Sequence, residues 1–256
     1  MNLLQVIDLP LNLIQYTNGY GGYSNGYGGG TAIIWILFGI IALVGWMVQA
    51  RLQNRFTKYS RIPLRNGMTG KEVAEKMLRD NGINDVQVLS VKGQLTDHYN
   101  PLNKTINLSE AVYSSNSVAA AAVAAHETGH AVQHAVGFAP LKMRSALVPI
   151  ISSTSKWVMW VILLGIVMIN TFPMLLWFGI AMFALTTLFS FITLPVEKNA
   201  TNRALQWLSS AGITDVGNHN QAVDALRWAG YTYVVAALSS LATLLYYVMI
   251  ALGSRR

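Results

Sequence analysis

The sequence predicts a mainly α-helical integral membrane protein, with four transmembrane helices and a cytoplasmic α+β domain. Of its 256 residues, 53% are hydrophobic and only 11% are charged, less than half of the roughly 25% found in an average soluble domain. Charged residues are also absent from three long runs, residues 9–50, 157–196 and 228–254. Charge-free runs of this length exclude an ordinary soluble globule and an intrinsically disordered chain.

Four membrane-spanning helices are expected, each lying mostly within one of these runs. The first covers residues 32–50, which would extend about 28 Å as a helix, close to the thickness of the hydrocarbon core. The second run is too long for one span and contains an Asn-Thr-Phe-Pro turn signal at residues 170–173. It is therefore expected to form a hairpin of two helices, about 150–169 and 174–194. The fourth span covers about 231–252.

Basic residues set the expected orientation of the chain. Sixteen of the 18 Lys and Arg residues lie in segments 51–156 and 195–230, which four spans place on the same side of the membrane. The positive-inside rule puts that side in the cytoplasm and both termini outside. The net charge of +7 is then a topology signal, and no nucleic-acid partner is expected. Residues 1–31 are expected to form a flexible external tail, because their Gly- and Tyr-rich part has too little apolar surface to fold.

The cytoplasmic domain is expected to consist of residues 51–149 and the helical segment 195–230. A capping box at Thr69 and Glu72 predicts a helix that runs to about Arg79, and Asn81-Gly82 is its expected C-terminal stop. This helix is expected to precede the β part of the domain.

Two apolar segments rich in β-branched residues, 86–91 and 104–108, predict strands that could pair in a small sheet. Farther along the chain, Asn116 or Ser117 is expected to cap an Ala-rich helix over residues 118–136. The high alanine content makes this helix thin, so that it can pack close to its neighbours.

The Ala-rich helix carries the sequence His126-Glu127-Thr128-Gly129-His130, an H-E-x-x-H motif. Because side chains four residues apart lie on one face of a helix, both imidazoles can bind one zinc ion. Glu127 points to the adjacent side, where it can take a proton from a water that the metal activates. The alternative is that the two histidines only pack or cap, but a glutamate in an apolar helix then has no purpose. The chain has no cysteine, so any further metal ligand is a His, Asp or Glu.

A catalytic zinc ion usually has three protein ligands. His134 continues the four-residue spacing, but it lies about 12 Å from His126 along the helix axis and is expected to pack or to act outside the metal shell. Glu197 is the best candidate, because it is the first acidic residue after 69 without one and directly follows the third span, where an unpaired carboxylate is costly. Pro195 is expected to open the helix that carries it. An interfacial glutamate near a helix N-terminus is the alternative.

Several segments resemble the bacterial membrane-embedded neutral zinc metallopeptidases, the YugP-like family of gluzincin-type peptidases. The similar segments are 95–101 with 108–109, 124–133, 194–204 and 231–237, and the resemblance extends over about residues 32–252. It implies a zincin-like metalloprotease domain in a multi-pass protein of the bacterial cell membrane. It also implies one zinc ion per chain, with His126, His130 and Glu197 as ligands and Glu127 as the catalytic acid and base.

The sequence departs from more distant membrane gluzincins of the heat-shock and prenyl-protein-processing type. Those enzymes carry an aspartate four residues after the ligand glutamate, and here that position is Thr201. The group that orients a zinc-bound histidine is therefore left open between Asn199 and Thr201.

An oxyanion-stabilising donor is also required for hydrolysis through a tetrahedral intermediate. The available donors are His98, Tyr99, Arg203 and His219. We favour His98, in a family-like segment, and Arg203, near the ligand glutamate, as further candidate catalytic residues. Their alternatives are turn hydrogen bonding for His98 and contact with lipid headgroups for Arg203.

The predicted function is a membrane-bound zinc metalloendopeptidase that hydrolyses peptide bonds at the cytoplasmic membrane surface. Its expected partners are peptide or membrane-protein substrates and the lipid bilayer, and an extended substrate could add to the strand at 104–108. The alternatives are a membrane zinc-binding protein without peptidase activity and a zinc hydrolase of a non-peptide bond. A transporter or channel is disfavoured, because the three apolar runs contain no acidic or basic residue.

Overall fold

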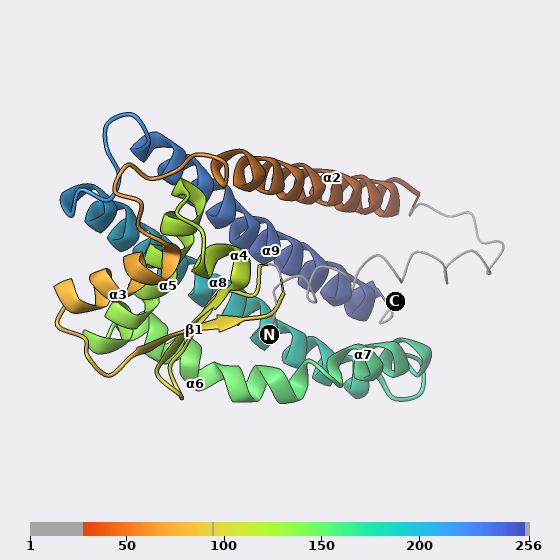
Figure 1. Cartoon of the computed structure of the whole chain (residues 1–256). Coiled ribbons are helices and arrows are strands. Elements are labelled where there is room, and N and C mark those ends of the chain that lie inside the picture. The colour runs from red at the N-terminus through yellow and green to blue at the C-terminus, as the bar shows by residue number, and fades with distance from the viewer. Residues whose placement is uncertain (1–27, 94, 254–256) are drawn as a thin grey trace. The chain divides into compact units, whose positions relative to one another are not determined.

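The structure, a computed structural model, describes residues 28–93 and 95–253 (Figure 1). The chain divides into two compact units, which are described separately. The first, here called the apolar unit, contains residues 28–47, 144–192 and 233–253 of the described chain; the second, the site unit, contains Val48–Met143 and Thr193–Thr232. Most of the predicted Gly- and Tyr-rich tail, residues 1–27, lies outside the described residues.

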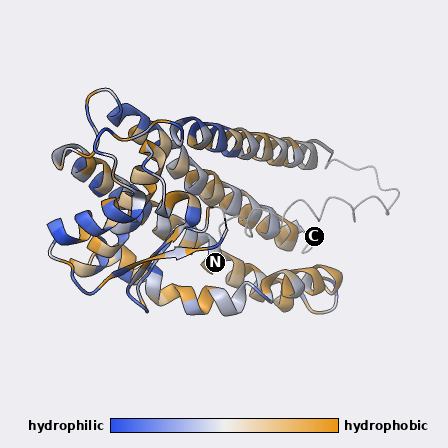
Figure 2. Ribbon diagram, viewed as in Figure 1, coloured by the Kyte–Doolittle hydropathy of each residue, from blue (hydrophilic) through white to orange (hydrophobic). Residues whose placement is uncertain are grey.

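Long apolar helices make up the apolar unit. The helices that contribute to it are α2 (Gly28–Tyr59), α6 (Ala139–Thr154), α7 (Val158–Val167), α8 (Pro173–Ser210) and α9 (His219–Gly253). Figure 2 shows that α7 is almost wholly hydrophobic. Large apolar side chains such as Trp46 and Trp160 are each 68% exposed, as expected of residues that face lipid rather than water.

Three of the described helices, α2 over Ile34–Tyr59, α8 and α9, are long and apolar enough to cross a membrane. The predicted second span, 150–169, is not one straight helix: α6 and α7 meet at an angle of 51°. The break falls at residues 155–157, around the charged Lys156. The described residues thus hold three candidate spans, or four if the bent pair is a single broken span.

The turn between α7 and α8 lies where the Asn-Thr-Phe-Pro signal predicts it, and α8 begins at Pro173. Its first turns pack closely on α7, because a Cβ atom at Gly165 would lie 2.6 Å from the Cα atom of Leu176. Buried residues of α7, α8 and α9, among them Ile162 and Tyr247, form the core of this unit.

In the described part of the chain, the site unit contains a small sheet, three helices of its own, and parts of α2, α6, α8 and α9. Its own elements are α3 (Gly70–Asp80), β1 (Gln87–Val91), β2 (His98–Asn100), β3 (Thr105–Ser109), α4 (Glu110–Tyr113) and α5 (Val118–Ala135). The predicted capping box is confirmed: the Thr69 hydroxyl accepts from the Glu72 amide, and the Glu72 carboxylate accepts from the Thr69 amide. Helix α3 ends at Asp80, Asn81 caps its C-terminus, and Gly82 follows with φ +69°.

The sheet has the strand order β1-β3-β2, with β1 parallel and β2 antiparallel to β3. The two predicted strands are confirmed as β1 and β3. The prediction that a substrate adds to the strand at 104–108 is wrong. This strand is β3, the central strand of the sheet, and it already has a neighbouring strand on each side. The edges of the sheet are β1 and the three-residue strand β2, which the sequence did not predict.

Helix α5 is confirmed where the Ala-rich segment predicts it. The Ser117 hydroxyl caps it by accepting from the Ala120 amide at 3.2 Å, and Gly137 follows its end with φ +67°. Nearly all of its alanines are fully buried, in a core formed with α3, β3, α8 and α9. The small side chains therefore let neighbouring elements approach the backbone of α5 closely.

Residues 193–210 of α8 belong to the site unit. The prediction that Pro195 opens a new helix is wrong, because α8 runs unbroken through it from Pro173 to Ser210. A proline has a helical φ and lacks only one amide donor, and the long apolar segment before it keeps the chain helical. Glu197 therefore lies in the middle of a helix rather than in its first turn.

Candidate metal centre

Three side chains from α5 and α8 converge in the site unit. His126 and His130 lie one turn apart on α5, with ring centroids 4.9 Å apart. Glu197 reaches them from α8: its Oε2 atom lies 3.1 Å from His126 Nε2 and 3.5 Å from His130 Nε2. One ligand atom from each of the three residues lies within 4.8 Å of the others, so the group could hold a metal ion.

The close approach of α8 to α5 depends on Gly129, between the two histidines. A Cβ atom at this position would lie 2.8 Å from the carbonyl oxygen of Ala200 on α8, closer than real Cβ contacts. Ala200 comes three residues after Glu197, slightly less than one full turn of α8. The contact therefore sets the depth at which the Glu197 carboxylate meets the two imidazoles.

The charge state of Glu197 fits a cation. Its side chain is buried, with 3% of the residue exposed, and burial alone would raise its pKa. The imidazoles of His130 and His126 outweigh that effect by charge and hydrogen bonding, and hold the pKa of Glu197 well below its usual range. Two imidazole nitrogens and one carboxylate oxygen are the donor set of gluzincin-type sites, and three protein ligands leave the fourth position that a catalytic zinc ion requires. The residues present therefore fit zinc.

Glu127 lies beside this group and outside the set of three. Burial raises its pKa to about 7, against the opposing charge of His126. Its Oε2 atom accepts a hydrogen bond of 3.0 Å from the backbone amide of Tyr99 in β2. A carboxyl group that titrates near neutral pH, held by a main-chain donor, can both accept and return a proton.

Each candidate ligand histidine has a second partner on its Nδ1 atom. His126 Nδ1 lies 3.2 Å from the Thr201 hydroxyl, at the position where more distant enzymes carry aspartate. His130 Nδ1 lies 3.0 Å from Gln133 Oε1, and Asn199 reaches His130 only through Gln133. The sequence reasoning missed Gln133, although a glutamine on the buried face of an Ala-rich helix, three residues after a candidate ligand, is a usable signal.

The two further catalytic candidates lie away from the three converging side chains. His98 is exposed on β2, with Nδ1 2.7 Å from the Thr96 carbonyl oxygen and Nε2 3.3 Å from Asn107 Nδ2. Arg203 donates from Nε to Asn199 Oδ1 at 2.9 Å. Within residues 28–93 and 95–253, neither side chain has a hydrogen bond to Glu127 or to the converging residues, so their catalytic roles stay predictions.

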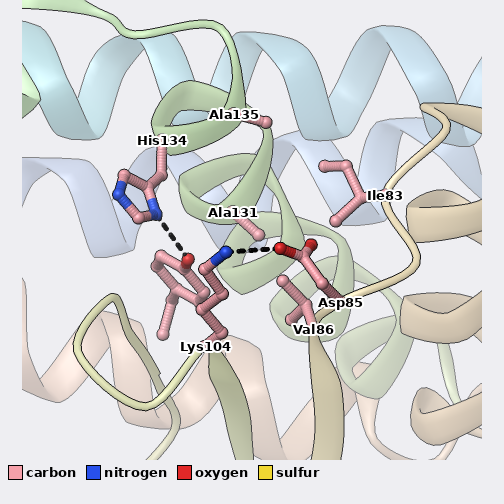
Figure 3. A pocket seen from close by; sticks show the side chains of 8 residues that line it. Ile83, Asp85, Val86, Lys104, Ala131, His134 and Ala135 are labelled. Carbon is pink, nitrogen blue, oxygen red and sulfur yellow. Dashed lines mark hydrogen bonds and ion pairs between the residues drawn. The ribbon is translucent and has the colours of Figure 1, made fainter.

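A separate cavity of about 210 Å³ lies on the next turns of α5 (Figure 3). Tyr99 and His134 line it, and the Tyr99 hydroxyl lies 2.7 Å from His134 Nδ1. Lys104 and Asp85 line it as well and form an ion pair, which lowers the pKa of Asp85. His134 thus pairs with the side chain of Tyr99, whose main-chain amide donates to Glu127. The structure does not bring His134 to His126 and His130.

Comparison with known proteins agrees with this geometry. A family model described as putative neutral zinc metallopeptidase matches residues 34–252. The putative membrane protease YugP of Bacillus subtilis strain 168 is 39% identical over 224 residues, which are 87% of this chain and 99% of that protein. No solved structure matches. The membrane protease relative and the apolar helices together assign the chain to a membrane.

Proposed function

The chain belongs to this family of putative neutral zinc metallopeptidases, and on that premise we propose that it is a membrane-bound zinc metalloendopeptidase. The observation that carries the proposal is the convergence of His126, His130 and Glu197 from two helices, with Glu127 beside them. Family membership alone implies a zinc peptidase, and the convergence supplies a specific set of residues for it.

The proposed ligands are His126, His130 and Glu197, which would hold one zinc ion per chain. A zinc ion held there supplies Lewis-acid polarisation of the scissile carbonyl and of the attacking water. The ionised state of Glu197, held by its low pKa, supports a ligand role for its carboxylate. Thr201 contacts Nδ1 of His126, and Gln133 contacts Nδ1 of His130. These contacts keep the Nε2 atoms of both rings turned toward Glu197.

Glu127 is the proposed general base and acid. Its carboxylate takes a proton from the attacking water and returns it to the amine of the leaving peptide. The Tyr99 amide holds one carboxylate oxygen of Glu127, which leaves the other oxygen available for this proton. His98 and Arg203 are proposed as further groups that act on the substrate or its oxyanion.

An extended peptide substrate is proposed to bind beside β2 rather than β3. In an antiparallel pair, alternate residues turn their amides toward the neighbouring strand and away from it. The Tyr99 amide donates to Glu127 and not to β3. The main chain of Tyr99 therefore points to the outer edge of β2, which pairs with no further strand among the described residues. A peptide along this edge would run past Glu127, and main-chain hydrogen bonding would hold it whatever its sequence.

The proposed site faces the cytoplasm at the membrane surface, in a chain with four spans whose two termini are outside. The bent pair α6 and α7 is then one broken span. The distribution of Lys and Arg supports this orientation, and Glu197 comes only five residues after Ile192, the last α8 residue of the apolar unit. Substrates are accordingly proposed to be membrane proteins or peptides near the membrane.

The test is purification of the full chain in detergent, metal analysis and a casein-type protease assay, on the wild type and on Glu127→Gln. We expect about one zinc ion per chain in both proteins and hydrolysis only by the wild type. Equal activity of the two proteins would reject Glu127 as the base. A wild-type protein that neither contains nor binds zinc would reject the proposed function as a whole.

A further inference from the structure

We infer that Gln133 is a positioning residue that fixes the tautomer of His130. In this inference Gln133 accepts a hydrogen bond from His130 Nδ1, which leaves the lone pair of His130 Nε2 free for a metal ion. The inference rests on the proposed function and deepens it. It follows from the donors and acceptors in a chain of four side chains, His130, Gln133, Asn199 and Arg203, that ties α5 to α8.

The chain of hydrogen bonds starts at Arg203, which can only donate. Its Nε atom lies 2.9 Å from the side-chain atom of Asn199 assigned as Oδ1. Only an oxygen can accept from a guanidinium group, so the amide of Asn199 has one permitted orientation. Its oxygen then also faces Gln133, at 3.0 Å from Gln133 Nε2.

The orientation of the Gln133 amide follows from two acceptors. The backbone carbonyl of Val196 lies 2.7 Å from Gln133 Nε2, and Asn199 Oδ1 is the second neighbour of the same atom. Since neither oxygen can donate, the Gln133 atom that faces them is the NH₂ group, and both of its hydrogens are used. The remaining atom of the Gln133 amide is therefore the oxygen.

That oxygen lies 3.0 Å from His130 Nδ1 and can only accept. His130 Nδ1 must therefore carry a proton, and the neutral form of an imidazole, which is the form that binds a metal ion, has only one N–H. His130 Nε2 is then the unprotonated nitrogen, and it is the atom that lies 3.5 Å from Glu197 Oε2. The hydrogen-bond chain thus presents the lone pair of His130 toward the other two candidate ligands, which is the form a metal ion requires.

Burial strengthens the preference for the His130 tautomer that is protonated on Nδ1. Gln133 is fully buried, with 0% exposed, and His130 is 7% exposed, so water does not offer an alternative donor to the Gln133 oxygen. The opposite tautomer would set the Nδ1 lone pair against that oxygen, two acceptors without a proton between them. His126 is controlled less strictly, because its Nδ1 atom faces the Thr201 hydroxyl, which can donate or accept.

The experiment measures zinc affinity rather than activity. Full-length protein in detergent competes with a chromophoric chelator for zinc, as wild type, Gln133→Met, Gln133→Glu and the control Thr128→Val. Thr128 is as buried as Gln133 and lies on the same helix, but its hydroxyl donates within α5 to the Ala124 carbonyl. The control therefore removes a buried polar group without touching the hydrogen-bond chain.

We expect Gln133→Met to bind zinc roughly 10–100-fold more weakly than wild type, the usual effect of losing such a partner. Gln133→Glu keeps an acceptor opposite His130 Nδ1 but loses both donors to α8. Its zinc affinity should stay within about tenfold of the wild-type value. Thr128→Val should bind zinc as tightly as wild type.

Three results would overturn the inference while leaving the proposed function intact: Gln133→Met as tight as wild type, Gln133→Glu as weak as Gln133→Met, or Thr128→Val as weak as Gln133→Met. The second result would mean that Gln133 only ties the two helices together. Failure of the wild type to bind zinc would instead reject the proposed function.

A second measurement needs no variant at position 133. Histidine-selective ¹⁵N NMR of the zinc-loaded wild type, assigned by replacing one histidine at a time, reports which ring nitrogen carries a proton. We expect a protonated Nδ1 and a zinc-bound Nε2 for His130. Coordination of His130 through Nδ1 would overturn the inference even if every variant at position 133 failed to fold.

Discussion

Gly129 on α5 lies so close to Ala200 on α8 that a Cβ atom at position 129 would be 2.8 Å from the Ala200 carbonyl oxygen. Gly129 separates the two histidines of the H-E-x-x-H motif, and Ala200 follows Glu197 on its helix. The contact is between backbone and backbone, so no side chain can rotate away to relieve it. The spacing of the three proposed ligands thus depends on the absence of a side chain at residue 129.

The first prediction concerns Gly129→Ala. The added methyl group must push α8 away from α5 by some tenths of an ångström, which moves Glu197 relative to His126 and His130. We expect zinc affinity, measured by chelator competition, to fall at least about tenfold, since metal sites tolerate displacements of only about 0.2 Å in their bond lengths.

Gly230→Ala is the matched control for this experiment. Gly230 is also a helical glycine of the site unit, on α9, but a Cβ atom there would meet nothing within 4 Å. Replacing it should leave zinc affinity unchanged and raise the free energy of unfolding by about 0.5–1 kcal/mol, because alanine favours a helix over glycine. Equal zinc affinity of Gly129→Ala and Gly230→Ala would show that the contact with Ala200 does not set the site.

The second prediction concerns removal of the metal. A ligand that binds only the folded state stabilises it by about 2.7 kcal/mol at a free concentration of 100 times its Kd. Chelator treatment should therefore lower the Tm of the wild type, and added zinc should restore it. In Glu197→Gln, which lacks the only proposed carboxylate ligand, the Tm should not respond to zinc; a zinc-dependent rise of normal size would remove Glu197 from the ligand set.

The third prediction separates His134 from the other two histidines of α5. His134→Ala should retain about one zinc ion per chain, because His134 Nδ1 pairs with the Tyr99 hydroxyl rather than with the proposed ligands. It should lose about 1 kcal/mol of stability, the usual net value of one hydrogen bond. His130→Ala, the comparison on the same helix, should lose zinc binding. Loss of zinc from His134→Ala as well would contradict the arrangement in the site unit.

Local signals account for the parts of the fold that the sequence predicted well. The capping box of α3, the Ser117 cap and alanine content of α5, and the apolar runs of α2, α8 and α9 all depend on residues a few positions apart. The H-E-x-x-H spacing belongs to the same class, since the helix alone brings His126 and His130 together. Glu197, 71 residues from His126 along the chain, could be proposed because an isolated carboxylate at the end of an apolar run needs a partner.

The features that sequence reasoning missed depend on distant contacts. Strand β2 has only three residues, and its position depends on pairing with β3 and on one hydrogen bond from the Tyr99 amide to Glu127. The partners of the Gln133 amide, Val196 and Asn199, are 63 and 66 residues away, so its role cannot be predicted from α5 alone. Pro195 illustrates the reverse error: a local rule predicted a helix start, and the surrounding long helix overrides it.

The last prediction tests the open edge of β2 with modified substrates. If a peptide pairs with this edge through its main chain, then N-methylation of one substrate amide removes a donor and adds bulk where the strands meet. For a peptide that the wild type cleaves, methylation at successive positions near the scissile bond should lower kcat/KM in an alternating pattern, because successive amides of a strand point in opposite directions.

The affected positions should lose roughly tenfold in kcat/KM, equivalent to about 1.4 kcal/mol for one lost hydrogen bond in the transition state. The alternate positions, whose amides point away from β2, serve as internal controls and should change little. A uniform loss at every position would instead indicate a steric limit of the cleft, and no loss at any position would exclude main-chain pairing with β2. The alternating result would identify Tyr99, whose amide already faces Glu127, as the point where substrate and proposed base meet.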